Sequence, residues 1–420
     1  MRAKKVLSIV LAAGMTMGLT AGMATTAHAE FSTKELQVNI WDNNQLAGLQ
    51  QIADEWSETS GVKVTINVVD WDNYWTLLEA GASGGQMPDV FWMHSNTAQM
   101  YMENDLLLNL DDYIANDDAI DLANYYEGIV DLYNSDGVQY ALPKDHDTIA
   151  LLYNKAIFDK YGVDYPTDDW TWEDMAEKAK ALTKDDGSVY GIGAGFDTQC
   201  GIYNTIYACG GYIISEDKKS SGYDLEETQA GVQCWIDLQE AGVSPSEASL
   251  EETTADAQFL SGRLAMYWGG SWFLGAVKTS DIMGDIDVVE LPSIEGKKAT
   301  VIHGLGNCIY EGTKSPDAAK AWVAFLAGET ANLISAETGA AIPALAGTAQ
   351  AWVDGTPEIN LKSFIKSSEE YSYPYPASAN TAEWQTYEAD CLKKAFSLDV
   401  PVADACADLA GQMNEVLAAE

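Results

Sequence analysis

Apolar and polar positions alternate near the start of the chain in a pattern that predicts a strand, a helix and a second strand. Residues 36–40 alternate as in a strand with one buried face, and residues 62–68 do the same. Between them, apolar side chains recur at helical spacing from residue 46 to residue 56. This order indicates a parallel sheet. It places the polar turn at residues 43–45 at the carboxyl end of a strand, where open α/β sheets bind ligands.

The same order continues with a helical pattern around residues 74–80 and a short apolar strand at residues 88–92. Residues 149–153 form a nearly unbroken apolar run, which is typical of a strand buried on both faces. The sequence Asp-His-Asp at residues 145–147 stands directly before this run. A solvated acidic group beside a buried strand is expected where a chain passes between two compact bodies. An ordinary loop entering a strand would have the same pattern.

Farther along, Thr171 and Asp174 resemble a capping box at the start of a helix with an apolar stripe from residue 172 to residue 182. The chain has 420 residues, which is too long for one typical hydrophobic core, so we expect two domains. Its 47% hydrophobic content is sufficient for a globular protein.

The first 29 residues differ from the rest and predict an export signal. Arg2, Lys4 and Lys5 precede an apolar run at residues 6–20, and the sequence Ala-His-Ala at residues 27–29 has the form of a signal-peptidase site. The apolar run is too short to span a membrane. We therefore expect cleavage near Ala29 and a soluble protein in the periplasm or the extracellular space at the cell surface.

The charge of the chain excludes two classes of partner. The chain has 23 basic and 64 acidic residues, and the predicted signal holds three of the basic ones. The remaining 20 basic and 64 acidic residues give a net charge of −44. Because such a field repels phosphate groups, we expect neither nucleic-acid binding nor adsorption to an anionic membrane.

Six cysteines occur without the spacing of a zinc site. In an exported protein Cys200 could pair with Cys209, and Cys391 with Cys406. Free buried thiols are the alternative, and the sequence leaves both open.

Several segments in a fixed order carry a resemblance to a known family. They are IWDNN, MPDVFWMHSNTAQMY, ALPKDHDTIALLYNKAIFDKYG, DDWTWEDM, FLSGRLAMYWGGSW, HGLGNCIY and TGAAIPA, and they follow the predicted signal. Together they resemble the family-1 extracellular solute-binding proteins of carbohydrate ABC importers, the family that includes the maltose-binding protein. The resemblance covers essentially the whole chain after the signal. It implies a two-lobed α/β fold of the periplasmic-binding-protein type (type II), with three hinge crossings and a ligand cleft between the lobes.

The resemblance also implies how the chain is divided and what it binds. Residues 30–146 and 305–345 would form lobe 1, and residues 147–304 and 346–420 would form lobe 2. A monosaccharide or oligosaccharide would lie in the cleft, and closure of the lobes would present the protein to the permease subunits of an importer. We expect a monomer with no cofactor, no metal and no enzymatic activity.

Candidate ligand residues come from the predicted loops and from the resemblance. Asp147 matches an acidic sugar ligand of the family, and Trp272 matches a stacking tryptophan. Glycines flank Trp268 and Trp272, and we expect them to open the ring faces. Tryptophan rings pack on the C–H faces of sugars, and amides and carboxylates bond their hydroxyls. The candidate set is Asn43, Asn44, Gln45, Trp92, His94, Ser95, Asn96, Asp145, Asp147, Trp268, Trp272, His303 and Trp384.

Two other functions use the same residue types. His94, His146 and His303 could form a zinc site, although their local motifs lack ligand spacing. A secreted glycoside hydrolase needs two carboxylates on either side of one glycosidic bond. Asp145 and Asp147 are candidates for that pair, but both belong to one strand entry and would lie on the same side of a ligand.

Overall fold

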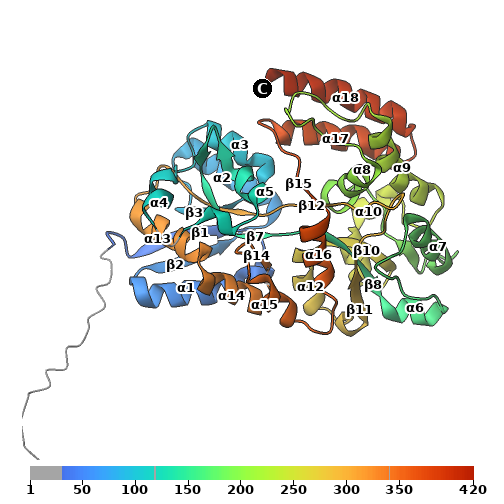
Figure 1. Ribbon diagram of the computed structural model, residues 1–420, viewed down its shortest axis with the longest axis horizontal. Coiled ribbons are helices and arrows are strands. Elements are labelled where there is room, and N and C mark those ends of the chain that lie inside the picture. The colour runs from blue at the N-terminus through green and yellow to red at the C-terminus, as the bar shows by residue number, and fades with distance from the viewer. Residues whose placement is uncertain (1–30, 118–119, 340) are drawn as a thin grey trace, which may run out of the picture.

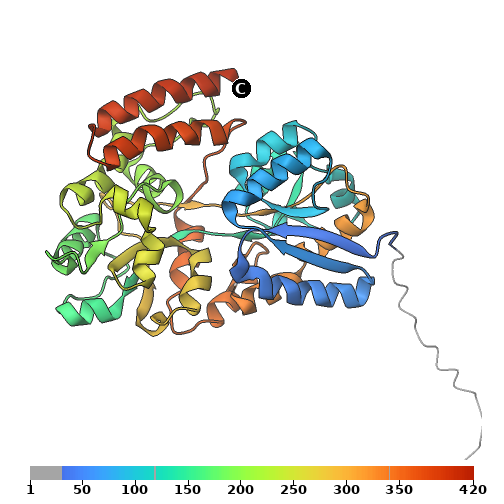
Figure 2. The same ribbon diagram turned by 180° about the vertical axis from the view of Figure 1, so that it is seen from behind.

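The computed structural model describes residues 31–117, 120–339 and 341–420, and the predicted export signal lies outside this part of the chain. Figures 1 and 2 show two α/β lobes side by side, each built around its own sheet. The fold predicted from the sequence is therefore confirmed. Among the described residues, no helix has both the length and the apolar character needed to cross a bilayer.

Lobe 1 contains a five-stranded sheet in the order β2-β1-β3-β13-β6. The two alternating segments of the sequence pair in parallel along their whole length, which confirms the predicted strand–helix–strand unit. Strand β13 runs antiparallel to both of its neighbours, although it lies far along the chain. The strands are β1 (Glu35–Ile40), β2 (Lys63–Val68), β3 (Val90–Met93), β6 (Ala141–Pro143) and β13 (Gly306–Ile309).

Helices cover both faces of the lobe 1 sheet (Figure 1). Trp322 of α13 packs in one hydrophobic core with Val38 of β1 and Trp56 of α1, so the segment after β13 belongs to lobe 1. The main helices are α1 (Leu46–Ser60), α2 (Trp71–Gly84), α3 (Ser95–Glu103), α13 (Pro316–Ala327) and α14 (Glu329–Thr338), with the shorter α4 (Asp111–Asn116) and α5 (Glu127–Val130).

Lobe 2 is built on a four-stranded sheet in the order β11-β8-β10-β9. All six residues of β8 are buried, which confirms the prediction of a strand buried on both faces. The strands are β8 (Ile149–Asn154), β9 (Tyr190–Ile192), β10 (Leu264–Gly270) and β11 (Ile286–Val289).

The helices of lobe 2 include the predicted capped helix. Thr171 and Asp174 form a reciprocal capping box at the start of α7, because each side chain accepts from the backbone N–H of the other. The antiparallel pair α17 and α18 forms an outer layer of the lobe (Figures 1 and 2). The helices are α6 (Lys155–Tyr161), α7 (Trp172–Leu182), α8 (Tyr203–Cys209), α9 (Glu226–Glu240), α10 (Glu247–Glu252), α11 (Ala255–Leu260), α12 (Leu274–Lys278), α15 (Ala349–Asp354), α16 (Lys362–Glu370), α17 (Thr381–Phe396) and α18 (Val402–Ala419).

The chain passes between the lobes three times. Leu142 and Leu305 belong to the lobe 1 core, whereas Ile149 and Val301 belong to a lobe 2 core, so two crossings lie between these residues. The third crossing contains β14 (Ile342–Pro343), which pairs with β7 (Asp145–His146) of the first. The lobe limits at residues 146, 304 and 345 fall in these crossings, and we retain them as a proposal. Two short strands, β12 (Thr300–Ile302) and β15 (Ser372–Pro374), pair beside the crossings.

All six cysteines are free thiols in the structure. The pairings of Cys200 with Cys209 and of Cys391 with Cys406 therefore do not form here. Cys209, at the end of α8, instead neighbours Cys234 on helix α9, and this neighbour lowers the pKa of the Cys209 thiol.

Candidate functional site

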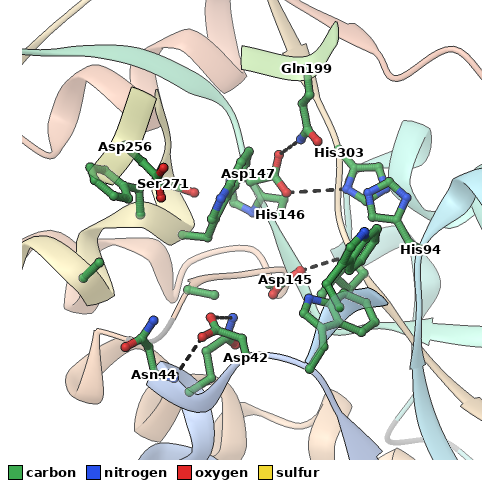
Figure 3. Close-up of a pocket in the computed structure, with 18 of the residues that line it drawn as sticks. Asp42, Asn44, His94, Asp145, His146, Asp147, Gln199, Asp256, Ser271 and His303 are labelled. Atoms are coloured by element: carbon green, nitrogen blue, oxygen red, sulfur yellow. Dashed lines mark hydrogen bonds and ion pairs between the residues drawn. The ribbon is translucent and has the colours of Figure 1, made fainter. Parts of the chain in front are cut away.

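A cavity of about 500 Å³ lies between the lobes, and we call it the interlobe cleft. Lobe 1, the crossings and lobe 2 all contribute side chains to it, as Figure 3 shows. Seven of the thirteen candidate residues line it: Asn44, Gln45, His94, Asp145, Asp147, Trp272 and His303.

The turn after β1 brings two of these residues to the cleft. Asp42 caps the single turn of 3-10 helix at residues 43–45, because its Oδ1 accepts from the backbone N–H of Asn44 at 2.9 Å. The side chain of Gln45 donates to the other carboxylate oxygen of Asp42 at 3.1 Å. Because Asp42 holds the turn in this form, Asn44 reaches the cleft and Asn43 points to solvent.

The Asp145 carboxylate links two crossings, and both of its oxygens already interact with protein groups. Its Oδ1 accepts from the backbone N–H of Leu305 at 2.9 Å, and its Oδ2 forms an ion pair with Lys144. Lys144 also donates to Gln45 Oε1 at 2.7 Å and lies 4.2 Å from the ring centroid of Trp92. Asp145 therefore lines the cleft mainly as part of the hinge.

Asp147 is the carboxylate that the structure leaves more available. Its Oδ1 accepts from the side-chain amide of Gln199 at 2.8 Å, and its Oδ2 lies 3.5 Å from His303 Nδ1 (Figure 3). Burial raises the pKa of Asp147 well above its ordinary value, and the neighbouring charge of Asp145 adds to the shift. A carboxyl group that keeps its proton to higher pH can donate a hydrogen bond as well as accept one.

His94 and His303 stack on each other with ring centroids 4.0 Å apart. Burial lowers the pKa of His303 to about 4, and it lowers the pKa of His94 well below its usual value, with a further contribution from His303. His303 Nε2 is 3.1 Å from the hydroxyl of Ser95, and His94 Nδ1 accepts from the backbone N–H of Asn96. The pair is therefore a neutral ring surface at physiological pH.

These histidines do not form a metal centre with His146. The Nδ1 of His146 is 3.1 Å from the carbonyl oxygen of Pro343, and its ring packs on Tyr126 with centroids 4.7 Å apart. In residues 31–117, 120–339 and 341–420, no group of three His, Cys, Asp or Glu side chains is arranged to hold a metal ion. The alternative of a zinc site at His94, His146 and His303 therefore lacks a coordinating geometry.

Trp272 reaches the cleft because of the glycine two positions before it. Trp272 lies in the 3-10 turn at residues 271–273 that follows β10. A β-carbon at residue 270 would overlap its six-membered ring, so Gly270 makes room for the ring against the backbone. We expected the glycines to expose the face of the Trp272 ring. Gly270 instead leaves the space in which that ring packs against the backbone.

Six candidate residues lie outside the cleft. Asn43 is exposed, and Ser95 and Asn96 support the histidine pair from behind. The three tryptophans are buried, which corrects the expectation that they line the cleft. Trp92 packs in the lobe 1 core, Trp268 packs edge-to-face against Trp235 in the lobe 2 core, and Trp384 donates from its indole nitrogen to Ser378 Oγ inside lobe 2.

The cleft also contains residues that the sequence did not single out. Trp41 and Trp71 stand edge-to-face with centroids 5.1 Å apart, and Trp71 makes the same kind of contact with His94. Trp41 directly precedes the predicted turn, so its position in the sequence could have identified it as a cleft residue. Gln199 and Asp256, both from lobe 2, had no such signal, because only the folded chain brings them opposite lobe 1.

The lobes touch at the rim of the cleft. A β-carbon at Gly275 of α12 would lie only 2.9 Å from the Cβ of Asn44, which belongs to lobe 1. The absence of a side chain at residue 275 therefore permits this close approach.

Comparison with known proteins gives a consistent result. The family model described as a bacterial extracellular solute-binding protein matches residues 41–333. A maltotriose-binding protein of Pyrococcus abyssi is 28% identical over 270 residues, covering 62% of this chain and 55% of that protein. A galactooligosaccharide-binding protein of Bacillus subtilis is 23% identical, covering 82% of this chain and 81% of that protein.

Among solved structures, an ABC substrate-binding protein of Listeria monocytogenes in complex with cycloalternan superimposes with a TM-score of 0.84. It is 24% identical, and the match covers 92% of this chain and 99% of that one. At this identity the similarity establishes a shared fold.

Proposed function

Because the chain belongs to the bacterial extracellular solute-binding protein family, we propose that it captures a monosaccharide or oligosaccharide in the interlobe cleft and delivers it to an ABC importer. The observation that carries this proposal is the composition of the cleft. Tryptophan rings from both lobes and directional polar groups line one cavity between two lobes joined by three crossings. The similarity to proteins named as maltotriose-binding and galactooligosaccharide-binding agrees with it.

The cleft fits a sugar because it offers both kinds of contact that a pyranose needs. Trp71 and Trp272 can pack against C–H faces from opposite lobes. Asn44, Asp147 and Gln199 can exchange hydrogen bonds with hydroxyls. We infer that the neutral His94–His303 pair gives the ligand a third ring surface at the back of the cleft.

Delivery would depend on the two lobes closing over the sugar. The permease subunits would recognise the closed arrangement, in which both lobes present their outer surfaces together. The export signal at residues 1–29 and a location in the periplasm or at the cell surface belong to the same proposal, as does a monomeric state.

We propose that the protein has no hydrolytic activity. A glycosidase requires two carboxyl groups on either side of the scissile bond, one as an acid and one as a base or nucleophile. Asp145 is engaged by Lys144 and by the Leu305 N–H, and it lies in the same strand entry as Asp147. This arrangement favours binding over cleavage.

Ligand screening tests the proposal directly. The protein without its first 29 residues would be heated with a panel of monosaccharides and of gluco- and galactooligosaccharides. A sugar present at about 100 times its dissociation constant should stabilise the fold by roughly 2.7 kcal/mol and raise the melting temperature. Sugar capture would be contradicted if no sugar stabilised the protein and amino acids did so instead. It would also be contradicted if no sugar stabilised the protein and metal ions did, with an effect that a chelator abolishes.

A further inference from the structure

A second cavity, of about 610 Å³, lies in lobe 2 next to the interlobe cleft. The two cavities share three lining residues: Asp256, Tyr267 and Trp272. The other residues that line the second cavity come from lobe 2, including Phe196, Trp235, Trp268 and Lys393. A ligand in the cleft could therefore continue into the second cavity without leaving the surface of Trp272.

Trp272 is held firmly enough to act as the common wall. Its ring packs against both hydrophobic cores of lobe 2, and Gly270 leaves the space that its six-membered ring occupies. The ring nevertheless remains partly exposed and lines both cavities. An aromatic ring that lines both cavities can support sugar units in each of them.

The second cavity combines aromatic rings with polar groups, as the cleft does. Trp235 and Trp268 meet edge-to-face with centroids 5.0 Å apart, and both line the cavity. The indole N–H of Trp268 points to Met175 Sδ in the core, at 3.4 Å. The polar atom of Trp268 is thus turned inward, and the two rings, 2% and 3% exposed, form the apolar base of the cavity beneath Trp272.

Several carboxylate oxygens of this cavity remain available to a ligand. Glu247 is 5% exposed, and its Oε2 accepts from the backbone N–H of Phe196 at 2.9 Å. Within the described residues, its Oε1 has no hydrogen-bond partner, and the same is true of both carboxylate oxygens of Asp256. Acceptors beside aromatic rings are the combination that binds sugar hydroxyls and C–H faces.

We propose that the second cavity is an additional saccharide subsite, which holds the sugar units that extend past Trp272 from those in the cleft. The preferred ligand is then an oligosaccharide longer than two units that bends around Trp272, whereas a monosaccharide or disaccharide occupies only the cleft. This inference rests on the proposed function, since it assigns the chain length of the sugar that the cleft captures.

The inference can be tested by blocking the second cavity alone. Thr254 is exposed, lines the second cavity but not the cleft, and does not cap α11 with its side chain. The substitution Thr254→Trp should narrow the cavity from its rim. Thr253 is also exposed but does not line the cavity, so Thr253→Trp is the matched control.

Isothermal titration would compare two series on the wild type and both variants: glucose to maltotetraose, and galactose to galactotetraose. In the series that binds, the wild type and Thr253→Trp should bind the tetrasaccharide at least tenfold more tightly than the disaccharide. Thr254→Trp should lose most of this gain and keep the disaccharide affinity within about twofold. Equal affinities for the disaccharide and the tetrasaccharide in the wild type, or the same gain in both variants, would overturn the inference and leave sugar capture intact. Binding of neither series would instead contradict the proposed function.

Discussion

The lobe 1 wall of the cleft combines a packed group of rings with the polar turn at Asn44, whereas the lobe 2 wall carries one indole ring, Trp272, among polar groups. In lobe 1, Trp41 contacts Trp71, Trp75 and Trp92 with ring centroids between 5.1 and 5.8 Å apart. In lobe 2, Trp272 stands beside Gln199 and Asp256. Mutual packing holds the first wall in place before any ligand arrives. The second wall offers hydrogen-bonding groups whose spacing can discriminate between sugars, so we assign affinity to both walls and selectivity mainly to lobe 2.

The largest expected effect is a contrast between Trp268 and Trp272, two tryptophans of lobe 2 that are four residues apart: one substitution should reduce stability and the other sugar affinity. Trp268 is in the core, and Trp268→Ala should cost roughly 3–5 kcal/mol of unfolding free energy. Trp272→Ala should instead cost roughly 2 kcal/mol or more of sugar affinity, about a 30-fold loss, with a smaller loss of stability. Melting curves of the unliganded variants beside calorimetric titrations measure both. A large melting loss with unchanged affinity in Trp272→Ala would remove this ring from the site.

The core of lobe 2 also contains a titrating group. Glu388 is fully buried and accepts hydrogen bonds from Tyr203 and Tyr223, and burial raises its pKa from 4.5 to about 8. The folded state therefore holds this proton more tightly than the unfolded state does. The contribution to stability is complete below about pH 4.5 and is lost as the pH rises through 8.

Glu388→Gln should remove this pH dependence. Since one pKa unit corresponds to about 1.4 kcal/mol, the unfolding free energy of the wild type relative to the variant should fall by a few kcal/mol between pH 5 and pH 8.5. Denaturant titrations at the two pH values measure it. Glu383→Gln, on the exposed side of the same helix, is the control and should follow the wild type. Parallel pH profiles for Glu388→Gln and the wild type would contradict the assignment.

Asp147→Asn tests the polar part of the comparison. The amide keeps the shape of the side chain and can still accept from Gln199, but it loses the acid–base character of the carboxyl group. We expect a loss of roughly 1–3 kcal/mol in affinity for the best sugar, and a smaller loss for analogues that lack the contacted hydroxyl. Titration with the sugar and its deoxy analogues measures both values. An equal loss for every analogue would place Asp147 outside direct contact with the ligand.

The smallest expected effect concerns the place where the two walls meet. In Gly275→Ala the new methyl group would lie 2.9 Å from the Cβ of Asn44 and would hold the rim apart. We expect about a tenfold loss of affinity, near the lower end of the ~1–3 kcal/mol cost of overpacking. Gly284→Ala is the control, because a β-carbon there meets no atom within 4 Å. Equal affinities of the two variants would show that rim contact is not required for binding.

Much of the fold could be predicted from local sequence patterns. The alternation at residues 36–40 and 62–68, the apolar run of β8 and the capping box at Thr171 depend on near neighbours, and the structure confirms all of them. The turn at Asn44 and Gln45 could be placed for the same reason, because the residues that set it follow one strand.

The rest of the site depended on contacts between distant residues. Gln199 meets Asp147 across 52 residues of sequence, and no local pattern encodes that pairing. Trp268 and Trp272 are four residues apart and both have glycine neighbours, so one continuous strand would place both rings on the same face. However, β10 ends at Gly270, between the two tryptophans. The change from strand to 3-10 turn sends one ring inward and leaves the other at the cleft. Trp384 was misplaced because only tertiary packing decides which face of α17 is buried.

The hydrogen bonds between the crossings limit how the lobes can move. β7 pairs with β14, Asp147 pairs through its backbone with His303, and the Asp145 carboxylate holds the Leu305 N–H. These bonds tie the three crossings to one another, so they cannot bend independently without breaking them. We infer that the lobes move mainly by rotation about an axis through these crossings. A protein built this way would pass between two defined arrangements, and an importer could read sugar occupancy from that rotation alone.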